Sequence, residues 1–192
     1  STRKESSAAS DVYKRQIIHK NNDLLLHLID DILDFSKIES GTLDYHISEM
    51  NIKEICEEVF LASSLKMKPK VKLVFDKELP SIRLKTDPQR VMQVISNFVN
   101  NAIKFTEKGS ITISYKREGN YLRVNVQDTG IGISEDDRKR IFERFIKINE
   151  FKQGTGLGLT ISRTIIESLN GAIGVDSVKG SGSTFWFTLP LE

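Results

Sequence analysis

Residues 86–106 read TDPQRVMQVISNFVNNAIKFT, and this stretch decides the fold. Asp87 followed by Pro88 predicts a helix start, because a short polar side chain caps the first turn and proline is pre-organised for it. Apolar residues then recur at helical spacing and form one stripe: Val91, Ile95, Phe98, Val99 and Ala102. We therefore expect a long helix that runs to about Phe105 and packs on a core.

The opposite side of this helix is polar. Asn97, Asn101 and Lys104 stand at positions i, i+4 and i+7, so they share one face. Amide oxygens suit a hard divalent cation, and a lysine ammonium suits the phosphates that accompany it. A polar helix face is more often a solvated surface, so the pattern alone does not decide between the two interpretations.

Strands and further helices surround this segment. Apolar residues alternate through residues 111–115 and again through residues 122–126, which predicts a hairpin. We expect further strands at residues 71–75 and 184–189, and further helices that begin near Asn51, Ser134 and Gly158. Helices that alternate with hairpins predict an α+β fold: a two-layer α/β sandwich with a mixed, mostly antiparallel sheet covered by helices on one face.

A glycine-containing motif, DTGIGI, occupies residues 128–133 directly after a predicted strand. Gly130 and Gly132 would admit a ligand close to the backbone. The Asp128 carboxylate can accept a hydrogen bond from an exocyclic amine such as that of adenine. An ordinary Asp-Gly turn would have the same local sequence, so both interpretations remain open.

A second motif, GTGLG at residues 154–158, opens a predicted helix. Bare backbone amides at a helix N-terminus attract anions, so phosphate is the natural ligand. The polar segment before it does not fit a dinucleotide-binding strand, and the sequence has no GxxxxGK[ST] motif. A hinge-rich loop without a ligand is the alternative.

In the closing strand, we expect Thr184 to add a hydroxyl near an adenine.

Composition limits the possible functions. The chain has 192 residues with 39% hydrophobic composition, enough for one domain with an extension. Lys and Arg number 28 against 26 Asp and Glu, and a net charge of +2 argues against direct nucleic-acid binding. Cys56 is the single cysteine, which excludes an internal disulfide and a cysteine-rich zinc site. No apolar run reaches the length of a membrane span.

The N-terminal part predicts the domain organisation. Residues 1–16 are polar and end in a run that looks like a translated adapter, so we expect a non-native or disordered leader. We expect a helix at residues 17–41, a linker at 42–51 and the globular domain at 52–192. The helix has a heptad seam and ends at a glycine: Ile18, Leu25, Leu28, Ile32, Phe35 and Gly41.

Together these motifs resemble the nucleotide site of the histidine-kinase branch of the ATPase superfamily shared with DNA gyrase and mismatch-repair ATPases. Residues 97–106 resemble its N box, residues 128–132 its G1 box, residues 142–145 its F box and residues 154–158 its G2 box. The resemblance covers residues 17–192. It implies the catalytic ATP-binding domain of a bacterial sensor histidine kinase, with a Bergerat-type ATP-binding fold.

The resemblance also implies ligands and roles for single residues. ATP and Mg²⁺ would bind, with Asn101 coordinating the metal, Lys104 meeting the phosphates and Asp128 reading adenine. Phe105 would pack near the base. The hinge of an ATP lid would comprise Gly154, Thr155, Gly156, Leu157 and Gly158.

Asn97 bears on the type of reaction. It stands where the hydrolytic relatives carry a glutamate that activates water, and asparagine cannot take that proton. We therefore expect phosphoryl transfer to another nucleophile, a histidine imidazole, rather than hydrolysis.

The helix at residues 17–41 resembles the second helix of a dimerisation and phosphotransfer hairpin. His19, His27 and His46 lack the acidic neighbour and the following Thr-Pro or Ser-Pro pair of an acceptor histidine. The chain is therefore expected to bind MgATP without phosphorylating itself.

The implied partners are the phosphotransfer hairpin of the same or a partner subunit, a second copy in a homodimer, and the receiver domain of a response regulator. The resemblance implies a cytoplasmic domain, with any membrane anchor lying upstream. The alternatives are a nucleotide-binding regulatory module without turnover, an ATP hydrolase of the same superfamily and a serine-kinase anti-sigma factor.

Overall fold

The computed structural model describes residues 22, 25–26, 28–144, 146 and 156–191. The chain divides into two compact units, Ser1–Thr42 and Leu43–Glu192. The predicted leader at residues 1–16 and Ile18 of the predicted seam lie outside the described residues.

The first unit contains a helix through residues 28–39. It ends as expected at Gly41, whose φ of 65° is a left-handed conformation that glycine adopts freely. Gly41 N donates to Ile38 O and Thr42 N donates to Lys37 O, the hydrogen-bond pattern of a Schellman cap. Leu25 and Ile32 of the seam are 56% and 57% exposed.

The second unit is built on a five-stranded sheet with the order β2-β4-β5-β7-β6. Its strands are β2 Val71–Phe75, β4 Gly109–Glu118, β5 Tyr121–Asp128, β6 Ala172–Val178 and β7 Gly182–Pro190. The β2–β4 pair is parallel, whereas the other three pairs are antiparallel. The sheet is therefore mixed and mostly antiparallel, as the sequence predicts.

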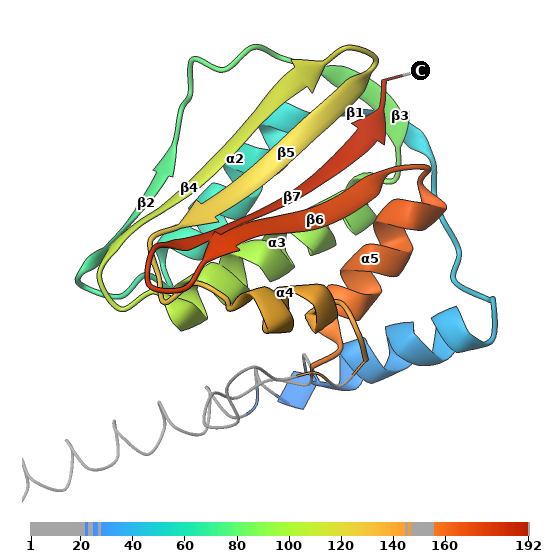
Figure 1. Ribbon diagram of the computed structural model, residues 1–192. Helices are drawn as coiled ribbons and strands as arrows, with labels where there is room; N and C mark the ends of the chain where they lie inside the picture. Colours follow the sequence, from blue (N-terminus) through green and yellow to red (C-terminus); the bar gives the residue numbers. More distant parts are fainter. Residues whose placement is uncertain (1–21, 23–24, 27, 145, 147–155, 192) are drawn as a thin grey trace, which may run out of the picture. The chain divides into compact units, whose positions relative to one another are not determined.

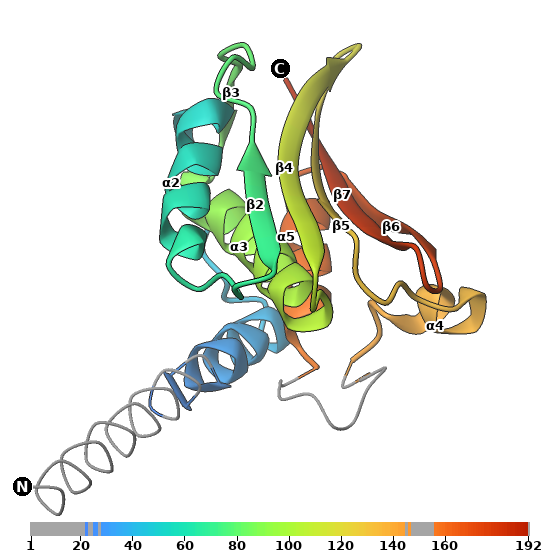
Figure 2. The same ribbon diagram turned by 90° about the vertical axis from the view of Figure 1, so that its left-hand side faces the viewer.

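Helices cover one face of this sheet. They are α2 (Ile52–Ser64), α3 (Pro88–Phe105) and α5 (Gly158–Ser168), which lie on the same side of the sheet in Figure 2. Along β5 and β7, alternate residues point toward these helices and are buried, from Leu122 to Val126 and from Phe185 to Leu189. The expected two-layer α/β sandwich is therefore confirmed.

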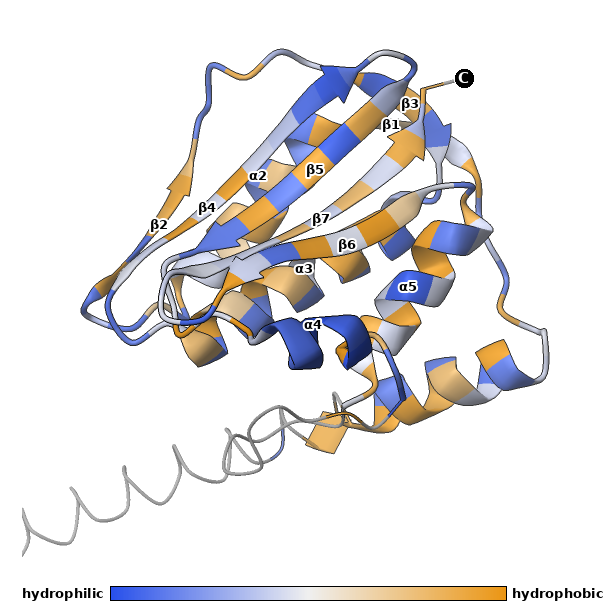
Figure 3. Ribbon diagram, in the orientation of Figure 1, coloured by the Kyte–Doolittle hydropathy of each residue, from blue (hydrophilic) through white to orange (hydrophobic). Residues whose placement is uncertain are grey.

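Some elements differ from expectation. A separate two-stranded sheet pairs β1 (Ser48–Asn51) with β3 (Arg83–Thr86), and neither strand was expected. Strand β6 was also not expected. The helix α4 (Glu135–Arg140) begins after its Ser134 cap as predicted, and it is only six residues long. In Figure 3 α4 is hydrophilic along its length, in agreement with its lack of buried residues.

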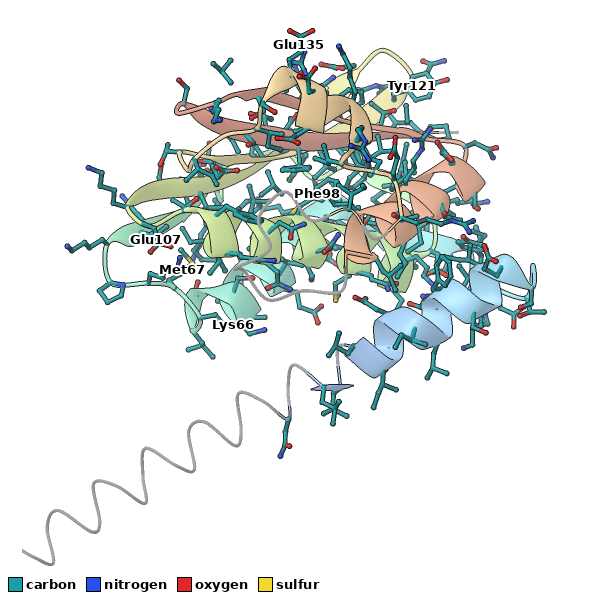
Figure 4. All side chains as sticks on the ribbon, turned by 60° about the horizontal axis from the view of Figure 1, so that its bottom comes forward. Lys66, Met67, Phe98, Glu107, Tyr121 and Glu135 are labelled. Atoms are coloured by element: carbon teal, nitrogen blue, oxygen red, sulfur yellow. The ribbon has the colours of Figure 1, made fainter. Side chains whose placement is uncertain are left out.

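Helix α3 is fixed at its start and along its buried face. Asp87 caps it: Oδ1 accepts from Arg90 N at 3.0 Å and Oδ2 accepts from His46 N at 2.8 Å. The Phe98 ring is fully buried, with its centroid 5.4 Å from that of Phe185 and 6.2 Å from that of Phe187. Figure 4 shows Phe98 in the interior, between α3 and the sheet. All five residues of the predicted stripe are buried.

No helix among the described residues is both long and apolar enough to cross a membrane.

Replacement of Phe98 by alanine should lower the free energy of unfolding by about 3–5 kcal/mol, because it leaves a cavity between α3 and the sheet. Leu65→Ala is a control of similar chemistry, since Leu65 is 92% exposed. It should change stability by less than about 0.5 kcal/mol. Urea unfolding followed by circular dichroism measures both. If Phe98→Ala does not fold, Phe98→Leu tests the same contact. A urea midpoint of the Phe98 variant equal to that of Leu65→Ala would contradict the role of Phe98 in the core.

Candidate functional site

Asp128 ends β5 and is a buried residue, with 5% exposure. The Asp128 Oδ1 atom accepts a hydrogen bond from Gly130 N at 2.7 Å. Burial raises the pKa of Asp128, while the backbone N–H groups of Gly130 and Ser183 lower it by less. The ionised carboxylate is therefore held in place but poorly solvated, so a hydrogen-bond donor from a ligand would stabilise it.

The loop after Asp128 lies against the end of α3. Ile131 N donates to Phe105 O at 3.4 Å. A Cβ atom at Gly130 would lie 2.6 Å from Phe105 O and 2.8 Å from Asp128 Oδ1, so only glycine fits there. Gly132 has a φ of 63°, and a Cβ there would lie 2.0 Å from Val178 O. The predicted glycines thus allow the loop to lie close to two other backbone segments.

The polar face of α3 adjoins this loop. Asn97, Asn101 and Lys104 are all partly exposed. Lys104 Nζ lies 5.0 Å from the ring centroid of Phe105. Among the described residues, no three His, Cys, Asp or Glu side chains gather as a metal site. A divalent cation here would depend on the amide oxygen of Asn101 together with oxygens supplied by a ligand, which is how Mg²⁺ binds beside nucleotide phosphates.

Asn97 connects α3 to the start of α5, a contact that the sequence did not reveal. Its Nδ2 donates to Ser162 Oγ at 3.0 Å. A Cβ at Gly158 would lie 2.6 Å from Asn97 Oδ1, so a glycine is needed where α5 begins. Asn97 therefore holds the two helices together in addition to facing the polar side of α3.

The described part of the second glycine motif begins at Gly156. Gly156 has a φ of 74°, and Leu157 is buried at 3% exposure. The N-cap residue of α5, Leu157, has an apolar side chain that makes no capping hydrogen bond. The backbone amides of this first turn are thus oriented as an anion site requires. The predicted site residues Gly154 and Thr155 lie outside the described residues, as does Phe145 of the F box.

The structure does not bring Thr184 to Asp128. In the β5–β7 register Asp128 pairs with Ser183, whereas Thr184 pairs with Gln127. Successive side chains point to opposite faces, so Thr184 lies on the face away from Asp128. Ser183 is buried at 6% exposure and takes the position that was expected for Thr184. The alternation of Phe185 and Phe187 toward the core was the signal that could have identified Ser183.

Three segments therefore form the candidate site: the Asp128 loop, the polar face of α3 and the start of α5. They are distant in sequence and adjacent in the fold (Figure 1). A buried acceptor, a cationic and amide-bearing helix face and a helix N-terminus together suit a purine nucleotide with its phosphates and a cation.

Comparisons with known proteins identify the family of this chain. Residues 86–192 match the family described as histidine kinase-, DNA gyrase B-, and HSP90-like ATPase. The sensor protein GacS of Pseudomonas syringae pv. syringae is 40% identical over 187 residues, which cover 91% of this chain and 20% of GacS. The chain thus spans about a fifth of the length of this relative.

Solved structures give the same result. Full-length ShkA in complex with AMPPNP has a TM-score of 0.77 and 32% identity, over 86% of this chain and 35% of ShkA. The catalytic domain of histidine kinase ThkA has a TM-score of 0.68 and 33% identity, over 76% of this chain and 96% of that domain. ThkA in complex with response regulator protein TrrA has a TM-score of 0.72 and 27% identity. The match covers 92% of this chain and 50% of the matched chain.

The family match extends over more than half of the chain, and the ThkA catalytic domain is matched almost completely. The motif resemblance noted in the sequence is therefore confirmed. The chain belongs to the histidine kinase-, DNA gyrase B- and HSP90-like ATPase family and contains the ATP-binding catalytic domain of a sensor histidine kinase.

Proposed function

We propose that this domain binds ATP with Mg²⁺ and presents the γ-phosphoryl group to a histidine on a phosphotransfer hairpin. The observation that carries the proposal is the buried Asp128 carboxylate, held by Gly130 N at the end of the polar face of α3. A buried, oriented acceptor beside a helix face with amide and ammonium groups matches the base and the phosphates of one nucleotide.

Except for Thr184, which lies on the face away from Asp128, the predicted residues each have a role in this proposal. Asp128 accepts from the exocyclic amine of adenine, while Gly130 and Gly132 keep the backbone open to the base. Phe105 packs near the base. Asn101 coordinates Mg²⁺, and Lys104 neutralises phosphate charge. The lid hinge comprises Gly154, Thr155, Gly156, Leu157 and Gly158, which bring backbone amides to the phosphates.

Asn97 favours transfer over hydrolysis. Its side-chain amide cannot act as a general base. The same amide donates a hydrogen bond to Ser162 of α5. In the proposed step an imidazole nitrogen of the acceptor forms a bond to the γ-phosphorus, and the bond from that phosphorus to the leaving ADP oxygen breaks. The residues of this chain position the reacting groups and stabilise charge, which is most of what phosphoryl transfer needs.

The partners of the whole protein follow from the same proposal. The acceptor hairpin belongs to the same or a partner subunit of a homodimer, and the half-exposed Leu25 and Ile32 suit such an association. The phosphoryl group would then pass to the receiver domain of a response regulator, and the ThkA complex with TrrA supports that partner class. We propose a bacterial source and a cytoplasmic location for this domain.

Replacement of Asp128 by asparagine should weaken ATP binding about 10- to 100-fold, because the amide cannot offer a charged acceptor to the adenine amine. Isothermal titration calorimetry measures the affinity. Asp176→Asn is the matched control, because the Asp176 side chain is 72% exposed and its carboxylate lies 3.6 Å from the guanidinium of Arg123. Its affinity should match that of the wild type. Unchanged binding in Asp128→Asn contradicts the base assignment.

Replacement of Asn101 by alanine should weaken binding of MgATP at least about tenfold, because the cation loses a protein oxygen ligand. Asn100→Ala is the control, since Asn100 is an exposed neighbour on the same helix. The affinities are compared with magnesium and with a chelator. With the chelator, the ATP affinities of the Asn101 variant and the wild type should be equal. An equal loss of affinity with magnesium and with the chelator would argue against Asn101 as a metal ligand.

Incubation of this chain with γ-labelled ATP should leave no acid-labile phosphate on the protein, because none of its three histidines has the context of an acceptor. Retained acid-labile label would contradict this. Steady-state phosphate release should also be slow, because Asn97 cannot activate water. Rapid release would instead support the hydrolase alternative.

A further inference from the structure

A single serine hydroxyl near the end of β6 connects three backbone segments around the Asp128 loop. Ile133 N donates to Ser177 Oγ at 2.8 Å. Ser177 Oγ also lies 2.9 Å from Gly182 O and 2.9 Å from Ser183 Oγ. Figures 1 and 2 show the β6–β7 turn next to the segment that leads from β5 to α4. Ser177 thus joins the end of the loop to both strands of the β6–β7 hairpin.

The chemistry of a hydroxyl fixes the direction of these hydrogen bonds. A carbonyl oxygen can only accept, so the one hydroxyl proton of Ser177 is donated to Gly182 O. The contact with Ser183 then requires the Ser183 hydroxyl to donate to Ser177 Oγ. With Ile133 N as the second donor, both acceptor positions of Ser177 are used. Removal of this hydroxyl leaves the buried Ile133 without its side-chain acceptor.

The same hairpin also contacts Asp128. Asp128 pairs with Ser183 in the sheet. The backbone at Gly182 lies so close to Asp128 O that a Cβ would come within 2.0 Å of it. Gly180 N donates to Ile131 O at 2.7 Å, which holds the middle of the loop. The orientation of Asp128 therefore depends on where the hairpin holds the loop.

We propose that Ser177 is a positioning residue for adenine recognition: its hydroxyl fixes both Ile133 and Ser183, and thereby aims the Asp128 carboxylate at the exocyclic amine. Ser177 does not touch the nucleotide in this proposal. The inference rests on the proposed function, in which Asp128 reads the base. It goes beyond that function, because base discrimination would then also depend on Ser177. This residue lies in β6, outside the four motifs of the sequence, and contacts the end of the Asp128 loop.

The test compares two ligands that differ only at the group Asp128 would read. ATP carries the exocyclic amine, and purine riboside triphosphate lacks it. Calorimetry with magnesium should show that the wild type prefers ATP by about 10-fold or more, the range expected for a hydrogen bond to a charged group. In Ser177→Ala this preference should fall to about threefold or less, through weaker ATP binding. Affinity for purine riboside triphosphate should change by less than about threefold.

Matched variants separate positioning from general damage. Ser177→Thr keeps the hydroxyl and should restore most of the ATP preference. Ser114→Ala makes the same change on β4, opposite Asn125 in the register, and should leave the preference unchanged. Should Ser177→Ala not fold, Ser177→Cys gives the same test, because a thiol of similar size is a poor hydrogen-bonding group.

The outcomes distinguish the inference from the function on which it rests. An ATP preference that persists in Ser177→Ala overturns the role of Ser177 and leaves the Asp128 assignment standing. An equal loss for both nucleotides also overturns it, because that result indicates a purely structural effect. A wild type that binds both nucleotides equally overturns the Asp128 assignment and the Ser177 proposal together.

Discussion

The packing of α3 on the sheet, through Phe98 against Phe185 and Phe187, is the contact on which the rest of the domain depends. Helix α3 has two faces with different tasks. Its apolar face closes the core, and its polar face carries Asn97, Asn101 and Lys104. Because both faces belong to one rigid helix, fixing the first also fixes the second. The core therefore determines where the amide and ammonium groups stand relative to Asp128.

The second constraint is the burial of Asp128. The residue is 5% exposed, and an ionised carboxylate in such surroundings is unfavourable unless hydrogen bonds compensate it. Burial accordingly raises the pKa of Asp128. Since the folded-state pKa is raised, the ionised form lowers the stability of the empty domain above that pKa. A ligand donor would remove part of this penalty.

Much of the fold was predictable because its signals are local. The stripe of α3, the alternation in β4 and β5 and the Gly41 cap each lie within one element. The strands β1 and β3 are only four residues long and pair across a large separation in sequence, so local pattern could not reveal them. In β6, Gly174 interrupts the pattern because the Trp186 ring lies across it: a Cβ there would lie 2.4 Å from Trp186 Cζ2.

The site was less predictable than the fold, because it depends on pairings between segments. The residue types at Asn101, Lys104 and Asp128 are compatible with a nucleotide, but each pattern left a second interpretation open, and only the resemblance to the family implied their roles. That Ser183, and not Thr184, lies beside Asp128 could be recognised only from the register of β5 and β7. The links from Asn97 to Ser162 and from Ser177 to Ile133 span 65 and 44 residues, and no motif connects them.

In the proposed function, one nucleotide lies between the Asp128 loop, the end of α3 and the start of α5. The most direct measurement is NMR mapping of backbone amides on addition of a non-hydrolysable ATP analogue with magnesium. The account predicts that shifts concentrate at residues 101–106, 128–133 and 156–158, with little change on the open face of the sheet. Shifts confined to that open face, or no shifts at saturating analogue, would contradict it.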